Sequence, residues 1–398
     1  MNWQRYSTGV AALAFWSFCS QPLSAQQAAK PLAVAAPADA GMDPAVLGQI
    51  AERMKEFVEK RQASGVVTLV ARDGKIVQHE AVGYADLDQQ RPMARDSLFA
   101  IASMTKPIAT TALMILVDEK KAALDDPVAK YLPEFKDVKL KDGTSPKQAI
   151  LVRHLLTHTA GLAGSQQNVG TLKETAAAVA QRPLEFEPGS RWQYSPGISV
   201  AGRVVEAASG QPFDEFLASR IFRPLGMVDT TFRPSPEQQK RLARLYQPTK
   251  DKQGIEATDH WLLQETNPNP SGGLFSTAGD LARFYQMILN GGELDGQRIV
   301  SPQAVAEMTR LQTGELATGF TPGNGWGLGF CLVRKPQGVT QSLSPGSFGH
   351  GGAFGTQGWL DPKRRMFFVL LIQRTGFGNS DASELRGALQ DLAVQAIQ

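Results

Sequence analysis

Residues 103–120 read SMTKPIATTALMILVDEK, and this stretch is the strongest indication of both fold and chemistry in the chain. Its apolar residues recur at helical spacing, and Pro107 fits a helix only in the first turn, so the helix is predicted to begin near Ser103. Residues three apart share a face of a helix, so the amine of Lys106 can reach the Ser103 hydroxyl. A serine needs an adjacent base, and a lysine stripped of solvent can lose its proton. The stretch therefore predicts a serine nucleophile with a lysine partner.

The segments outside this helix predict a sheet. Strand-like runs occur near both ends of the chain, at 66–71, 76–82, 326–333, around 355–360 and at 366–373. The first two flank Asp73-Gly74, which is a strong hairpin signal. Amphipathic helices are predicted over 44–58 and 381–398, where they can cover the strands. Strands at both ends with covering helices indicate one antiparallel sheet assembled from the two ends.

The middle of the chain, about 105–310, is rich in predicted helices and is punctuated by proline and glycine. We therefore expect an α/β (α+β) fold, in which an antiparallel sheet flanked by helices contains an inserted, mainly helical domain. The sheet part is expected at about 41–104 and 311–398, so that 41–398 form one domain.

Two further short motifs contain candidate site residues. Tyr194-Ser195-Pro196 precedes a helix-like run, and a tyrosine phenol beside a lysine can hold a lowered pKa and shuttle a proton. His350-Gly351-Gly352-Ala353 stands just before a predicted strand, where glycines allow close approach of a ligand and a backbone N–H can serve in an oxyanion hole. Each pattern alone is more often structural, and an S-x-x-K tetrapeptide is expected about once by chance in such a chain. Only the combination of the three motifs indicates an active site.

Taken together, the three patterns resemble those of the serine β-lactamase and penicillin-binding protein superfamily. Further segments are similar to landmarks of its class C β-lactamase-like branch, and they occur in the order of that branch: 154–162 (HLLTHTAGL), 224–227 (PLGM) and 272–277 (GGLFST). The resemblance covers about 45–395. The branch includes β-lactamases, D,D-peptidases, D-aminopeptidases, family VIII carboxylesterases and acyltransferases.

The resemblance implies a role for each motif residue. Ser103 matches the nucleophile, Lys106 the motif lysine, and Tyr194 the tyrosine that is base for acylation and acid toward the leaving group. His350 occupies the lysine position of the K-T-G-like triplet. The N–H of Ala353, beyond Gly351 and Gly352, joins that of Ser103 in the oxyanion hole.

Two positions depart from the β-lactamase pattern and shape the expected function. Pro196 stands where β-lactamases and D,D-peptidases usually have asparagine, and His350 replaces lysine, as in esterase members. We therefore expect a hydrolase, or an acyltransferase, that acts on small carboxylic esters through an acyl-enzyme on Ser103. The alternatives are a β-lactamase or a D,D-peptidase or D-aminopeptidase that acts on amide substrates.

Two rival classes remain beside this interpretation. An α/β-hydrolase needs G-x-S-x-G on a strand-to-helix turn, but in residues 197–201 (GISVA) alanine replaces the last glycine. A non-catalytic receptor of the penicillin-binding-protein type would keep the fold without turnover, and the presence of all three motifs argues against it.

The first residues predict export. Arg5, the apolar run 9–18 (GVAALAFWSF) and the small residues ending at Ala25 form a secretory signal over 1–25, with Ala28 or Ala29 as other cleavage points. Cys19 does not indicate a lipid anchor, because Phe18 precedes it where a small residue is needed. Residues 26–40 are expected to be a linker, and the location to be periplasmic or secreted.

Composition excludes several classes of partner and cofactor. A net charge of +3 without basic runs does not indicate nucleic acid or a membrane surface. Removal of the signal leaves Cys331 alone, so no intramolecular disulfide is expected. His154 and His158 are four apart, but no glutamate follows His154 as the zinc-protease pattern requires. We expect no metal and no cofactor.

Overall fold

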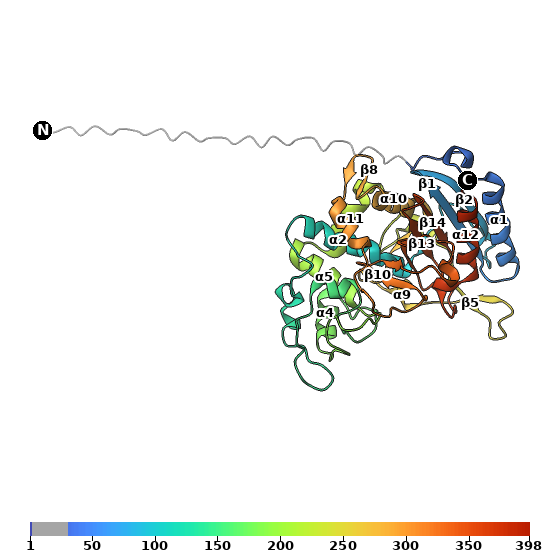
Figure 1. Ribbon diagram of the computed structural model, residues 1–398. Helices are drawn as coiled ribbons and strands as arrows, with labels where there is room; N and C mark the ends of the chain where they lie inside the picture. The colour runs from blue at the N-terminus through green and yellow to red at the C-terminus, as the bar shows by residue number, and fades with distance from the viewer. Residues whose placement is uncertain (2–30) are drawn as a thin grey trace.

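The computed structural model describes Met1 and residues 31–398, and its centre is an antiparallel sheet of eight strands (Figure 1). The predicted signal lies, apart from Met1, outside the described residues. Along the sheet the strand order is β10 (Asn324–Trp326), β11 (Cys331–Val333), β12 (Phe348–Gly351), β13 (Gln357–Asp361), β14 (Met366–Leu371), β1 (Gly65–Arg72), β2 (Lys75–Asp86) and β3 (Arg91–Pro92). The predicted antiparallel sheet built from both chain ends is confirmed.

The two chain ends meet in the middle of this sheet. β1 pairs with β14 from Val67 opposite Leu371 to Arg72 opposite Met366. β1 also pairs with β2 across the predicted hairpin, where Asp73 (φ 53°) and Gly74 (φ 79°) both take left-handed conformations. A tight hairpin turn requires two residues with positive φ between the paired strands, and the sequence Asp-Gly adopts these conformations at little energetic cost.

Alternate residues of the central strands face two separate cores, as expected for a pleated sheet buried on both sides. Val66 and Val70 of β1 pack with α1 (Pro44–Glu59) and α12 (Glu384–Gln395), which lie side by side in Figure 1. Residues Val67, Leu69 and Ala71 of the same strand face the opposite core, which includes α2 (Thr105–Asp118) and α10 (Ala278–Leu289). Asp43 caps α1 by accepting the Ala45 N–H at 2.8 Å.

The helical part lies beside the sheet, and α2 lies between the two (Figure 1). Its α5 (Gly197–Ser209) contacts α2, α3 (Val152–Leu156) and α4 (Leu172–Ala180). Twelve of the fourteen residues of α2 are buried, so this helix is the core element that joins the two parts. The remaining helices and strands are α6 (Phe213–Leu217), α7 (Arg223–Leu225), α8 (Pro236–Gln239), α9 (Trp261–Gln264), α11 (Pro302–Thr309), β4 (Phe99–Ala100), β5 (Tyr246–Pro248), β6 (Ile255–Ala257), β7 (Phe275–Ser276), β8 (Glu293–Leu294) and β9 (Gln297–Arg298).

Near the C-terminus the structure corrects the predicted strands. The run 326–333 is a hairpin of β10 and β11 rather than one strand, because Gly329 takes a left-handed φ of 68° and the Gly327 N–H closes the turn on the Phe330 carbonyl. The strand β12 was not predicted, since FGHG lacks an apolar run. His350 and Gly351 therefore end one strand and lie just before another.

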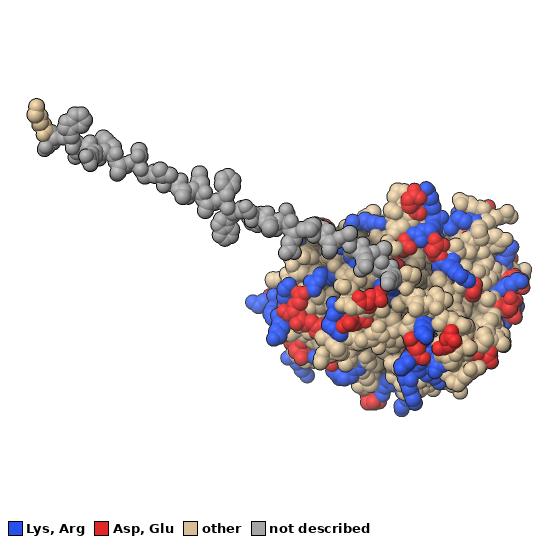
Figure 2. Space-filling model, turned by 90° about the horizontal axis from the view of Figure 1, so that it is seen from above, with Lys and Arg blue, Asp and Glu red and all other residues tan. Residues whose placement is uncertain are grey.

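Residues 31–40, which composition predicts as linker, pack on the folded part, where the Ala35 N–H donates to the Ile76 carbonyl at 3.0 Å. Within the described residues, no helix combines the length and apolar character needed to cross a membrane. On the face shown in Figure 2, Lys and Arg are interspersed with Asp and Glu, without a patch of one sign.

Candidate active site

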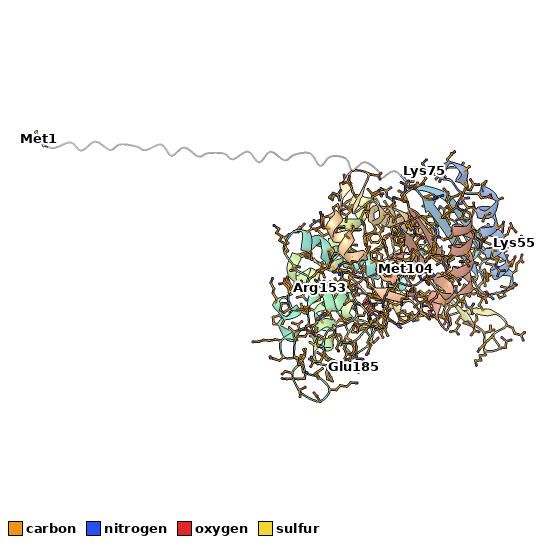
Figure 3. The ribbon with its side chains drawn as sticks, viewed as in Figure 1. Met1, Lys55, Lys75, Met104, Arg153 and Glu185 are labelled. Atoms are coloured by element: carbon orange, nitrogen blue, oxygen red, sulfur yellow. The ribbon has the colours of Figure 1, made fainter. Side chains whose placement is uncertain are left out.

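Ser103 lies on a tight turn immediately before α2, in the interior between the sheet and helical parts. Figure 3 shows its neighbour Met104 between the sheet part, with Lys55 and Lys75, and the helical part, with Arg153 and Glu185. The turn is a 3₁₀ helix, Ala102–Met104, and Ala102 takes a left-handed φ of 46°. A Cβ at Gly352 would lie 2.5 Å from the Ile101 carbonyl oxygen, so only glycine lets the end of β12 approach this turn.

Lys106 is fully buried, and its amine has three polar neighbours. Nζ lies 3.1 Å from Ser103 Oγ, 2.9 Å from Gln166 Oε1 and 2.6 Å from the Ser271 carbonyl oxygen. Burial holds the pKa of Lys106 well below its usual range, because the amine loses its water and, among residues 31–398, gains no carboxylate partner in exchange. Burial therefore favours the neutral amine more than in an exposed lysine.

The neighbours of a neutral Lys106 fix the direction of its lone pair. A neutral amine has two N–H bonds, and the carbonyl oxygens of Gln166 and Ser271 can only accept hydrogen bonds. When both N–H bonds are used on these oxygens, the lone pair faces Ser103 Oγ. Lys106 is thus oriented as the acceptor of the Ser103 proton.

Tyr194 takes the complementary role of a hydrogen-bond donor. Its Oη donates to Ser103 Oγ at 2.9 Å, and Lys106 Nζ lies 4.7 Å from the centre of its ring. Burial raises the pKa of Tyr194, so the expectation of a lowered phenol pKa is wrong. The physical reason is that Lys106 faces the ring rather than the phenol oxygen and is itself favoured as neutral. In the resting site the phenol is therefore a hydrogen-bond donor to Ser103 Oγ.

Gln166 and Asn269 complete the lysine environment, and sequence reasoning missed both. Asn269 is fully buried, donates to the Gln166 carbonyl oxygen at 3.0 Å, and accepts the Ser271 N–H at 2.8 Å. One side chain thus holds both of the segments that provide acceptors to Lys106. Gln166 is 60 residues from Lys106 in sequence and lies in an irregular loop, so no periodicity could place it.

His350 is buried and uncharged. Its Nδ1 donates to the Gly351 carbonyl oxygen at 2.6 Å, which leaves Nε2 unprotonated and, in the part of the chain described, without a hydrogen-bond partner. Burial lowers the pKa of His350 to about 3. The residue at the position of the family lysine therefore supplies no positive charge.

These groups open into a cavity of about 510 Å³. It is lined by predicted residues (Ser103, Tyr194, His350, Gly351, Gly352 and Ala353) and by residues that were not predicted (Phe320, Phe377, Gly378, Asn379, Ser380 and Asp381). Lys106 is buried behind Ser103. A larger cavity, of about 600 Å³ beside Asp73 and Arg365, contains none of the predicted site residues. We assign the chemistry to the smaller cavity because it contains the serine.

Aromatic rings form one wall of the smaller cavity. The Tyr194 and Phe320 rings meet edge to face at 4.9 Å, and Trp192 packs edge-on against Phe320 at 5.9 Å. Phe320 is 46% exposed and takes a left-handed φ of 74°, a strained conformation for a bulky residue. An exposed aromatic ring at the mouth of a cavity provides an apolar surface for a substrate. Across residues 31–398, no group of three or more His, Cys, Asp or Glu residues is placed to hold a metal ion.

Known proteins share the sequence pattern and the fold. A family model described as Beta-lactamase matches residues 50–393. Esterase EstB of Burkholderia gladioli is 33% identical over 81% of this chain and 88% of its own length. A putative D-alanyl-D-alanine carboxypeptidase of Escherichia coli O157:H7 is 30% identical over 78% of each chain. The solved structure of EstCE1, a hydrolase with promiscuous acyltransferase activity, superposes with a TM-score of 0.76 at 26% identity and covers 89% of this chain and 98% of its own.

Proposed function

The chain belongs to the β-lactamase family of serine hydrolases, and from this premise we propose that it cleaves small carboxylic esters through an acyl-enzyme on Ser103. The contacts around Ser103 Oγ support the first step. As Oγ attacks the ester carbonyl carbon, its proton passes to the lone pair of Lys106, which lies 3.1 Å away. The backbone N–H groups of Ser103 and Ala353 are the proposed donors to the oxyanion.

Collapse of the tetrahedral intermediate needs a proton on the leaving alcohol. Tyr194 is protonated at rest and contacts Ser103 Oγ, so it can donate its proton to the departing oxygen, and the proton on Lys106 then returns to Tyr194 through a water molecule that enters as the alcohol leaves. Lys106 then returns to the neutral amine. Deacylation repeats the sequence with water, or with an acceptor alcohol, as the attacking group.

The observation that carries the choice of an ester is Pro196. It is buried at the N-terminus of α5, directly after the loop that holds Tyr194, and has neither a polar side chain nor a backbone N–H. The amide side chain of a β-lactam or peptide substrate would lose the donor that asparagine gives in relatives. An unpaired buried amide costs about 1–3 kcal/mol, or about one to two orders of magnitude in rate. A short ester requires no such bond, and EstB is named as an esterase.

The second candidate is a D,D-carboxypeptidase, which the name of the Escherichia coli relative favours. Rates on p-nitrophenyl butyrate, nitrocefin and a D-Ala-D-Ala peptide separate the candidates. We expect kcat/KM for the ester to exceed both others at least tenfold, and Ser103→Ala to remove all three activities. A preference for β-lactam or peptide over every short ester tried would reject the ester proposal and leave the serine hydrolase assignment intact.

We also propose that the enzyme acts outside the cytoplasm, on the basis of the signal pattern in residues 1–25. The N-terminal sequence of the protein secreted by an expressing bacterium tests this. A mature chain that begins near residue 26 is the expected result, and an uncleaved cytoplasmic chain would contradict it.

A further inference from the structure

The formal charge of the residues that line the substrate cavity is negative, whereas a site for acidic substrates would present positive charge. Asp381 is the one formally charged side chain among the twelve lining residues, and no Lys or Arg is among these described residues. His350 is uncharged because its pKa is lowered, and Lys106 is buried behind Ser103 with its neutral form favoured. A substrate carboxylate would therefore meet no cation and one anion.

The carboxylate of Asp381 is held firmly against the strand that carries the glycine motif. Its Oδ1 accepts from Gln357 Nε2 at 3.1 Å, and Gln357 is fully buried. A Cβ at Gly351 would lie 1.8 Å from this oxygen, so the carboxylate occupies space that only a glycine leaves open. The Asn379 side chain accepts the Asp381 N–H at 3.0 Å and fixes the backbone. These contacts fix the position of the Asp381 carboxylate at the cavity.

Two guanidinium groups lie close to this segment, and neither forms an ion pair with the Asp381 carboxylate, although its charge raises the pKa of Arg386 against the larger, opposite effect of burial. Arg386 is fully buried, donates to the backbone carbonyl of Asp381, and stacks 4.0 Å from the ring centre of Trp359. Arg374 stacks 4.8 Å from the ring centre of Phe377. None of the ion pairs found within the described residues involves the Asp381 carboxylate. The negative charge also reaches the catalytic groups, because it adds to the main effect of burial in raising the pKa of Tyr194.

Aromatic rings stand near this carboxylate on the cavity surface. Phe320 and Phe377 line the cavity together with Asp381, and the Asn379 side chain donates to the Phe320 carbonyl oxygen, which ties the two loops together. A carboxylate among aromatic rings is a suitable environment for an ammonium group, since the charge and the ring faces both attract cations.

We propose that Asp381 and the neighbouring rings form a subsite for a positively charged group of the substrate, so that the enzyme selects cationic over anionic esters. This subsite rests on the proposed ester hydrolysis and adds a substrate class to it. It also gives a second reason for poor use of β-lactams and D-Ala-D-Ala peptides, both of which carry a carboxylate. A charge acting across a few ångströms in a partly exposed site changes rates by roughly ten- to a hundredfold.

Three p-nitrophenyl esters of matched acyl length test the subsite: the butyrate, the anionic hemisuccinate and the cationic 4-(trimethylammonio)butyrate. At constant ionic strength, kcat/KM of the wild-type enzyme is expected to be at least about tenfold higher for the cation than for the anion. In Asp381→Asn this ratio should fall at least about fivefold. Asp391→Asn, an exposed change on α12 outside the cavity, is the matched control and should leave the ratio unchanged.

The outcomes separate the two proposals. Equal rates on all three esters, or a ratio that Asp381→Asn leaves unchanged, would overturn the cation subsite while ester hydrolysis stands. Cleavage of none of the three esters would overturn the proposed function and the subsite with it. If Asp381→Asn does not fold, the ratio of kcat/KM for the cationic and anionic esters in the wild-type enzyme is the test. Equal values for the two esters would contradict the subsite without any variant.

Discussion

The two sides of Ser103 are built in different ways. On the inner side, Lys106 is fully buried and its amine is fixed by a side-chain oxygen and a backbone oxygen. On the outer side, Phe320 is nearly half exposed, and Asp381 lies in a short 3₁₀ helix, Ser380–Ala382, before the last helix. In the proposed mechanism the inner side moves the protons and therefore determines which reaction occurs. In the proposed subsite the outer side presents the rings and the charge and therefore selects the substrate.

The largest effect is expected from removing the base on the inner side. Lys106→Ala should lower kcat by about two to four orders of magnitude. Lys106→Arg should lower it to a similar extent, because arginine keeps a positive charge but cannot release its proton at working pH. Steady-state rates on p-nitrophenyl butyrate and circular dichroism of each variant provide the measurement. High activity in Lys106→Arg would show that the lysine acts as a cation and not as a base.

A slightly smaller loss is expected when the donor is removed. Tyr194→Phe keeps the ring that packs against Phe320 but deletes the hydroxyl on Ser103, and kcat should fall by about two orders of magnitude or more. Combined with Lys106→Ala, it should cost far less than the product of the two single losses, since both residues serve one proton path. A double-mutant cycle measures this. Multiplicative losses would place Tyr194 outside the proton path.

The role of the inner side can be tested further through Gln166, which contacts the Lys106 amine and positions it but does not itself exchange a proton. Gln166→Ala should reduce kcat by about tenfold, because one N–H of the amine loses its acceptor. In the wild-type enzyme, kcat/KM should rise with pH as Lys106 loses its proton. Gln166→Glu places a negative charge beside the amine and raises the pKa of Lys106, so the rise should move to higher pH.

The pH profiles of the wild-type and variant proteins check this role. Gln167, the exposed residue next to Gln166, provides the control, and Gln167→Ala should have the same pH profile as the wild-type enzyme. An unshifted profile in Gln166→Glu would mean that Lys106 is not the group whose ionisation limits the rate.

The smallest effect is expected on the outer side. Phe320→Ala should raise KM for longer acyl chains by a few-fold and leave kcat for acetate nearly constant, because it removes apolar contact area from the cavity mouth. A series of p-nitrophenyl esters from acetate to octanoate measures the change. Val228→Ala, at an exposed position outside the cavity, is the control. A drop in kcat for every chain length would show that Phe320 supports the chemistry itself.

Local patterns in the sequence predicted the sheet and the serine–lysine pair for a physical reason. Asp73-Gly74 meets the backbone requirement of the hairpin turn, and three-residue spacing alone brings Lys106 within reach of Ser103. The hairpin of β10 and β11 was not predicted, because apolar residues flank its central glycines and make the whole segment look like one strand.

The parts of the site that sequence reasoning missed depend on long-range placement. Gln166 and Asn269 are polar residues in loops, and Gln166 contacts Lys106 while Asn269 holds the Gln166 and Ser271 segments together. Asp381 was predicted at the start of a helix, and nothing local indicated that it lines a cavity. The pKa of Tyr194 was predicted in the wrong direction, because its value depends on burial and on the face of the ring that Lys106 contacts.

The most direct test is identification of the acylated residue. The signal-free protein is incubated with a fluorophosphonate probe or quenched during turnover of p-nitrophenyl butyrate, and the modified peptide is sequenced by mass spectrometry. The account predicts one modification, on Ser103, which is lost in Ser103→Ala and retained in Ser347→Ala, a change at a buried serine outside the cavity. A protein that turns over the ester without label on Ser103, or that labels equally in Ser103→Ala, would contradict it.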